Sequence, residues 1–199
     1  MLVVLPPHSA KLLEPGQVFF SLDDGFLSHN IATETAEEKY DEGLLVASHC
    51  GIVLDDGYVA EAWWPRWRVM SLFPRLQKRM PWVWTKTPAG QTPQSAAELC
   101  QKARDLAGTS YDTWGVLAFT LSDKDDRGQQ ENRLSDPEEY FCSEGVDTLL
   151  RATEKLRTVP LPESFKQVHP SWRSPQGLNQ SPIWEEQYEL SNCCAGDGE

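Results

Sequence analysis

The sequence predicts a single α+β domain in which an antiparallel sheet packs against a helix that begins at a cysteine. Two apolar runs on either side of Asp55-Asp56-Gly57 indicate a β-hairpin. Far downstream, apolar residues near helical spacing predict an amphipathic helix from about Cys142 to Arg157. The 199 residues, 40% of them apolar and eight of them tryptophan, fit one folded domain with a sizeable core.

The predicted hairpin brings a histidine and a carboxylate together. If Asp55-Asp56-Gly57 forms a type I turn closed by a left-handed glycine, Gly51 pairs with Glu61. Because side chains alternate along a strand, His49 and Glu61 then share one face, and Gly51 leaves open space beside the imidazole. Cys50 points to the opposite, core face. A two-residue loop would shift the pairing by one residue and send Glu61 to the other side of the sheet.

The other elements are predicted from local patterns. Val18 to Leu22 and Trp184 to Leu190 are strands, and Gln91 to Thr109 contains a helix with a capping-box pattern at Ser95-Ala-Ala-Glu98. Tyr111 to Leu121 is a short helix or an apolar strand. Met1 to Pro7 is expected to be an edge strand or a disordered start, and Asp23 to Gly43 a polar excursion or a short helix over the site. An acidic loop is expected over 122–139 and a loose tail over 191–199.

The placement of Cys142 in the first turn of its helix predicts a reactive thiol. The helix dipole and the free amide groups there favour the thiolate over the thiol. A cysteine that gives its proton to a nearby histidine is a nucleophile for acyl transfer. We therefore predict Cys142 as nucleophile, His49 as base and Glu61 as the carboxylate that orients the imidazole, with Asp55 or Asp56 as the alternatives to Glu61. Taken alone, Cys142 would be read as a buried inert thiol.

These residues resemble the circularly permuted branch of the NlpC-type papain-like superfamily, which contains YiiX-like proteins and the lecithin:retinol acyltransferases. The resemblance rests on His-Cys-Gly-Ile-Val-Leu, a glycine turn, an Ala-Glu-Ala strand and, much later, Phe-Cys-Ser-Glu at the start of a helix. In this branch the histidine strand precedes the cysteine helix. Further family-like elements are Leu13 to Phe20, with Gln17 where Asp is usual, Ser110-Tyr111-Asp112, and Ser174 to Leu178.

The resemblance implies a permuted papain-like fold and a cysteine peptidase or amidase without a cofactor. For much of the superfamily it implies cleavage of amide bonds in peptidoglycan stem peptides, and for the retinol acyltransferase relatives it implies acyl transfer or hydrolysis of thioesters and lipids. Tyr111 corresponds to a family tyrosine that would donate to the oxyanion beside the Cys142 backbone amide. A catalytically silent binding module of the same fold is the alternative outside enzymes.

The segment 63–86 is basic and rich in tryptophan. It contains six basic residues and no acidic one: Arg66, Arg68, Arg75, Lys78, Arg79 and Lys86. One interpretation is a substrate-binding surface made by Trp63, Trp64, Arg66 and Arg68 beside the hairpin. The other is that the tryptophans belong to the core and the charges are solvated. A zinc site at His49, Cys50 and Cys142 is not expected, because adjacent strand residues diverge and the usual ligand spacing is missing.

Charge and cysteine content limit the compartment and the partners. The formal charge of −12 at pH 7 disfavours general nucleic-acid binding. Met1 to Pro7 lacks both basic residues and a small-residue cleavage site, so we expect no Sec signal, and no segment is expected to span a membrane. Five cysteines without a Cys-x-x-Cys motif fit synthesis in a reducing cytosol. A hydrolase of the cell wall would then need export by a specialised secretion system, as an antibacterial effector with delivery or immunity partners.

Overall fold

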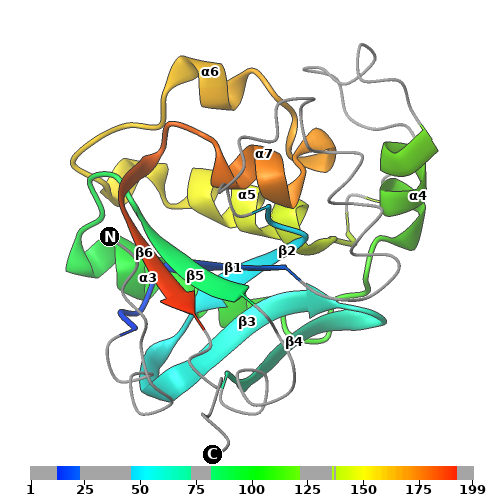
Figure 1. The fold of residues 1–199 in the computed structure, drawn as a ribbon, viewed down its shortest axis with the longest axis horizontal. Helices are drawn as coiled ribbons and strands as arrows, with labels where there is room; N and C mark the ends of the chain where they lie inside the picture. Colours follow the sequence, from blue (N-terminus) through cyan, green and yellow to red (C-terminus); the bar gives the residue numbers. More distant parts are fainter. Residues whose placement is uncertain (1–12, 23–45, 73–81, 122–135, 137, 192–199) are drawn as a thin grey trace, which may run out of the picture.

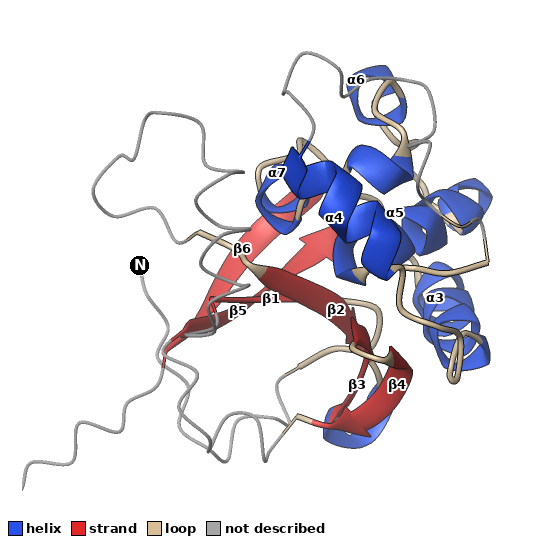
Figure 2. Ribbon diagram, turned by 90° about the vertical axis from the view of Figure 1, so that its right-hand side faces the viewer, coloured by secondary structure: helices blue, strands red, loops and turns tan. Residues whose placement is uncertain are grey.

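The computed structural model describes residues 13–22, 46–72, 82–121, 136 and 138–191. These residues form an α+β fold, as predicted, with a six-stranded antiparallel sheet in the order β4-β3-β2-β1-β5-β6. Its helices gather on one side of the sheet (Figures 1 and 2). The strands are β1 Val18–Leu22, β2 His49–Val53, β3 Tyr58–Trp63, β4 Arg66–Ser71, β5 Trp82–Pro88 and β6 Trp184–Ser191.

The helix that begins at Cys142 packs on the middle of the sheet, against β2. It ends at Ala152 rather than near Arg157, and a separate 3-10 turn, Glu154–Leu156, follows it. None of the described helices is long and apolar enough to cross a membrane. The helices are α3 Pro93–Asp105, α4 Thr113–Leu121, α5 Cys142–Ala152, α6 Glu163–Lys166 and α7 Pro175–Asn179, with a further 3-10 turn at Pro170–Trp172.

Two helix predictions are refined by the side chains that cap the helices. The capping box of α3 joins Thr92 and Ser95, three residues before the predicted box, because Pro93 starts the helix. The segment after Tyr111 is a helix, α4, and the Asp112 carboxylate accepts a hydrogen bond from Gly115 N at 2.6 Å in its first turn. The predictions for 1–7, for 23–43, for nearly all of 122–139 and for the tail after Ser191 concern residues outside the described part of the chain.

The β2–β3 hairpin forms with the predicted register. Ile52 pairs with Ala60, and Gly57 closes the 3-10 turn Asp55–Gly57 with a φ of 75°. The expectation of open space at Gly51 is wrong. A Cβ atom there would lie 2.5 Å from Phe19 Cε1 and 2.6 Å from the Ala60 carbonyl oxygen, so the Phe19 side chain and the backbone of β3 already fill the position. Gly51 is needed for the close approach of those groups, since interiors are densely packed.

The tryptophans of segment 63–86 do not form one surface. Trp67 and Trp84 are buried in the core, where their indole Nε1 atoms donate to Ala103 O at 2.8 Å and to Asn179 Oδ1 at 3.1 Å. Lys86 is buried as well, and its Nζ donates to Asn179 O at 2.5 Å. Trp64, by contrast, is 70% exposed. The core interpretation therefore holds for part of the segment, whereas Arg75, Lys78 and Arg79 lie outside the described residues.

Lys86 predicts a pH dependence of stability. Burial lowers the pKa of Lys86 from 10.5 to about 8, so between these values the unfolded chain binds a proton that the folded chain releases. Stability from this residue therefore rises as pH increases through that window. We expect the free energy of unfolding of the wild type, minus that of Lys86→Met, to increase from pH 7.5 to pH 10 in urea titrations. Other titrating groups are common to both proteins, so a difference that does not change with pH would contradict the assignment.

Candidate active site

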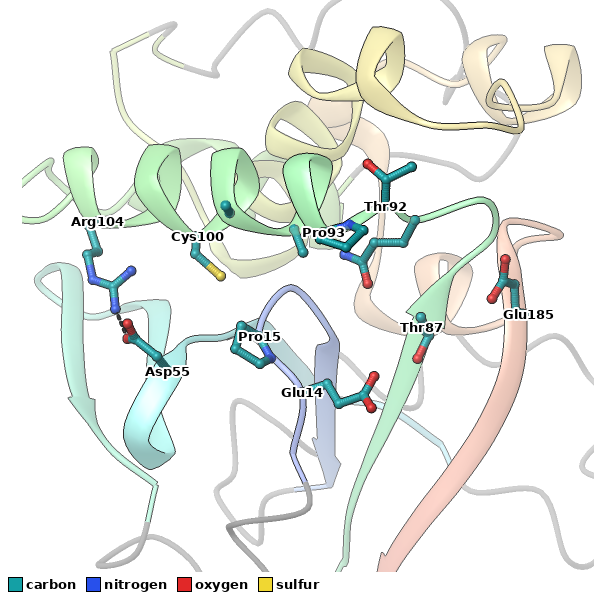
Figure 3. Close-up of a pocket in the computed structure, with 12 residues that line it drawn as sticks. Glu14, Pro15, Asp55, Thr87, Thr92, Pro93, Cys100, Arg104 and Glu185 are labelled. Carbon is teal, nitrogen blue, oxygen red and sulfur yellow. Dashed lines mark hydrogen bonds and ion pairs between the residues drawn. The ribbon is translucent and has the colours of Figure 1, made fainter.

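The hairpin brings His49 and Glu61 into direct contact. Glu61 Oε2 lies 2.9 Å from His49 Nε2, and the Glu61 side chain is fully buried. The expected contact between these two side chains is therefore present. Asp55, one of the alternatives, points instead toward Arg104 and forms an ion pair with it at the far end of the hairpin (Figure 3).

Arg68 donates hydrogen bonds to the second oxygen of the Glu61 carboxylate. Its Nε and Nη2 atoms donate to Glu61 Oε1 at 3.1 and 2.8 Å. The two residues are directly opposite in the β3–β4 pairing, which turns through Trp64-Pro65. Arg68 was expected to contact substrate, but the structure gives it a partner inside the protein. This pairing could have been predicted from the sequence, because a hairpin that turns at Trp64-Pro65 places Arg68 opposite Glu61.

Trp63 closes a ring of contacts with these three side chains. The edge of the Trp63 indole faces the His49 ring, with the ring centroids 5.3 Å apart and an interplanar angle of 80°. The Arg68 guanidinium carbon lies 4.8 Å from the centroid of the same indole. Such edge-to-face and cation–π contacts restrain both partners. Trp63 is thus part of the site, while Trp64 and Arg66 are exposed next to it.

Cys142 is the first residue of α5 and is only 4% exposed. Gly145, in the first turn of this helix, lets it approach the sheet closely. A Cβ atom there would collide with the Trp67 ring. The buried Trp67 and the absence of a side chain at Gly145 therefore fix how deep the start of α5 lies on the sheet.

The surroundings of Cys142 favour the thiolate. Its pKa lies well below the ordinary value of 9.0, mainly because the Cys50 side chain hydrogen-bonds to the sulfur. The charge and a side-chain hydrogen bond of His49, together with the Cys50 backbone, add to the effect and outweigh the opposing effect of burial. The charge of His49, the predicted base, is thus one of the causes that favour the thiolate.

Cys50 has a larger part in the site than the sequence indicated. As predicted, it is a fully buried core residue, but α5 packs on the face of the sheet that Cys50 lines. Burial and the neighbouring Cys142 raise the pKa of the Cys50 thiol well above 9.0, so it remains protonated and can donate to the Cys142 sulfur. Strand alternation predicts which face Cys50 lines, but not which helix covers that face.

Tyr111 also lies beside the thiol. Burial, followed by the charge of Cys142, raises the pKa of the Tyr111 hydroxyl far above its ordinary value. The hydroxyl therefore remains a hydrogen-bond donor across the physiological range. The backbone fixes its position, since Tyr111 N donates to Pro65 O at 3.0 Å and Ser110 forms an isolated bridge with Arg66.

Helix α7 supports the strand that carries the histidine. Gln176 Oε1 accepts a hydrogen bond from Ala47 N at 2.8 Å, just before β2, and another from Asn179 Nδ2 at 3.2 Å. The family-like segment Ser174 to Leu178 thus contacts the chain that leads to His49. Sequence reasoning could not assign Gln176 this role, because the two positions are 129 residues apart.

A cavity of about 710 Å³ lies away from the thiol, along α3 and the open ends of β5 and β6. Glu14, Thr87, Arg104 and Glu185 surround it, and Cys100 is on its helical wall (Figure 3). Its described lining includes neither Cys142 nor His49. The cavity is therefore separate from the candidate active site.

The described residues contain no group of three His, Cys, Asp or Glu side chains that could hold a metal ion.

Comparison with known proteins shows a likeness of fold. No protein-family model matches the chain, and no curated protein matches it. Among solved structures, the chain is similar to the metalloprotein YiiX from Escherichia coli O157:H7, with a TM-score of 0.57 and 16% sequence identity. The likeness covers 90% of this chain and 97% of that one. At this identity the comparison shows that the chain shares the YiiX-like α+β fold.

Proposed function

We propose that the chain is a cysteine hydrolase with a permuted papain-like fold, in which Cys142 attacks an amide carbonyl. One observation carries this proposal: His49 Nε2 is bound to the buried Glu61 at 2.9 Å, and the charge of His49 helps to lower the pKa of Cys142 at the start of α5. A nucleophile, a base and a group that orients the base are the three parts that covalent acyl transfer requires.

The proposed reaction begins with transfer of the Cys142 proton to His49. Glu61 binds Nε2, so Nδ1 is the nitrogen that exchanges protons with the thiol. The thiolate attacks the carbonyl, and the oxyanion accepts hydrogen bonds from the Cys142 backbone amide and the Tyr111 hydroxyl. His49 then returns the proton to the leaving amine, which departs and leaves a thioester. A water molecule deprotonated by His49 hydrolyses this acyl-enzyme and restores the thiol.

The substrate we favour is an amide bond in a peptidoglycan stem peptide. The resemblance to the NlpC-type superfamily supports this class. Stem peptides carry carboxylates, and the exposed Arg66 beside the site offers a planar guanidinium for one of them. Trp64, adjacent in sequence and 70% exposed, adds an aromatic face. Such an activity in the periplasm would require export of the protein by a specialised secretion system.

A second candidate is hydrolysis or transfer of lipid acyl groups. The nine residues of α4 carry no charge, and two of them, Trp114 and Leu117, are 65% and 42% exposed. Figure 1 shows α4 at the same end of the molecule as the start of α5 and the β3–β4 turn, where Trp64 is exposed. An exposed apolar surface near a reactive thiol suits a substrate with an acyl chain.

A direct assay separates these candidates. Purified muropeptides and, in parallel, an acyl thioester in detergent micelles are incubated with the wild type, Cys142→Ala and Cys100→Ala, and the products are read by mass spectrometry. We expect muropeptide cleavage by the wild type and by Cys100→Ala, whose changed thiol lies on α3, and none by Cys142→Ala. Turnover of the thioester alone would favour the second candidate. No Cys142-dependent product from either substrate would favour a binding module.

Arg68 offers a test of the buried network. Arg68→Ala removes both donors from Glu61 Oε1, so Glu61 and His49 are held less firmly. We expect kcat/KM to fall roughly tenfold to a hundredfold, which corresponds to a hydrogen bond to a charged group worth about 1.5–3 kcal/mol. Arg68→Lys keeps the positive charge but not the two donors of the planar guanidinium, so its kcat/KM should fall less than that of Arg68→Ala.

The matched control for this substitution is Arg104→Ala. It also breaks an arginine–carboxylate pair on the β2–β3 hairpin, but at the end away from the thiol. Activities are compared well below the melting temperature of each variant. Equal activity in Arg68→Ala and Arg104→Ala would show that Arg68 does not position Glu61.

A further inference from the structure

Two exposed tryptophans lie on adjacent segments at one end of the sheet. Trp64, in the turn between β3 and β4, and Trp114, in the first turn of α4, are the most exposed large apolar side chains among the described residues. The backbones of the two segments touch, because Tyr111 N donates to Pro65 O at 3.0 Å. Each tryptophan is at most three residues from this hydrogen bond along the chain. The two indoles therefore belong to one surface (Figure 1).

We call this surface the aromatic patch and define it by Trp64, Arg66, Trp114 and Leu117. Leu117 follows Trp114 by three residues on α4, so the two side chains are neighbours on that helix, and Leu117 is exposed as well. Arg66 is exposed and forms an isolated bridge with Ser110, which ties it to the segment before α4. A group of large apolar side chains on a surface marks a site of contact with another molecule or with a lipid phase.

The charges around the aromatic patch favour an electrically neutral partner. Tyr140 N donates to Ser110 O at 3.3 Å, which brings Glu138 and Glu139, the two residues before Tyr140, near the same segment. The whole chain has a formal charge of −12 at pH 7. These carboxylates repel an anionic membrane or another polyanion. The guanidinium of Arg66 can still pair with the phosphate of a zwitterionic headgroup, whose net charge is zero.

We propose that the aromatic patch docks the protein on a zwitterionic lipid surface, with the indoles of Trp64 and Trp114 among the headgroups. An indole combines a large apolar ring with one N–H donor, and for this reason tryptophan is enriched at the interface between a membrane and water. α4 adds nine residues without a charge to this surface. Docking of this kind is reversible, because only a few side chains enter the lipid.

The aromatic patch lies directly beside the proposed active site. Trp63 precedes Trp64 in the chain, and its indole faces the His49 ring with the centroids 5.3 Å apart. Docking through the patch therefore turns this side of the active site toward the lipid surface. The docking itself rests on the exposed side chains alone, so it does not depend on the proposed hydrolase function.

Sedimentation with sucrose-loaded phosphatidylcholine vesicles tests the proposal without a substrate. The bound fraction of the full chain is measured against lipid concentration for the wild type, Trp64→Ala, Trp114→Ala and the double variant. We expect each single substitution to weaken binding about fivefold to tenfold, because each removes an indole from the interface, and the double variant to lose binding. Tyr58→Ala is the matched control. Tyr58 is 46% exposed at the opposite end of β3 and its substitution should leave binding unchanged.

Two further arms identify what the aromatic patch binds. Vesicles that contain phosphatidylglycerol should bind the protein no more tightly than phosphatidylcholine vesicles, and tighter binding would overturn the assignment of a neutral surface. Analytical ultracentrifugation without lipid tests whether a second copy of the chain covers the patch. A dimer that Trp64→Ala and Trp114→Ala dissociate, in a protein that binds no vesicles, would overturn the proposal. An equal loss of vesicle binding in Tyr58→Ala would also overturn it.

The outcomes separate docking from the proposed hydrolase. Cys142→Ala should bind vesicles as the wild type does, since the thiol is not part of the aromatic patch. Melting temperatures check that each variant is folded, and Trp64→Gln and Trp114→Gln replace any alanine variant that is not. Vesicle binding by a protein that cleaves neither substrate class would support docking and contradict the hydrolase. Cleavage by a protein that binds no vesicles would do the reverse.

Discussion

The site depends on a carboxylate that is completely buried. Removing a charged group from water is costly unless partners satisfy it, and Glu61 has His49 on one oxygen and Arg68 on the other. Removal of one partner from a buried charged pair typically costs about 3–5 kcal/mol. The sheet must therefore hold β2, β3 and β4 in the one register that brings the three residues together. Stability and the orientation of the imidazole are thus supplied by the same interaction.

The second constraint is the depth at which α5 lies on the sheet. The first turn of α5 lies close to the sheet at Gly145, against the buried Trp67 ring, and its first residue, Cys142, has a pKa that Cys50 and His49 lower. Trp67 is held in turn by a hydrogen bond to Ala103 O in α3. Segments far apart in the chain therefore together position the start of α5 against β2, the strand that begins with His49.

The sequence allowed the hairpin and its contact to be predicted, because a short turn with a left-handed glycine fixes register through local chemistry. Cys142 at a helix start was also predictable from periodicity, as was the face that Cys50 lines. What packs on that face was not predictable, since the contact joins residues 92 positions apart in the chain. The expectation of open space at Gly51 failed because it, too, depends on a residue distant in the sequence. The Phe19 ring fills the space that a side chain at Gly51 would take.

Cys50 and His49 together keep Cys142 as a thiolate, and the proposed chemistry depends on this state. The most direct measurement is the rate of alkylation of each cysteine by iodoacetamide as a function of pH, in the wild type and in His49→Gln. We expect Cys142 to react ahead of Cys50 and Cys100 at a pH of about 6, and its titration to move to higher pH in His49→Gln. Labelling of Cys142 no faster than Cys100 at that pH, or an identical titration in His49→Gln, would contradict this expectation.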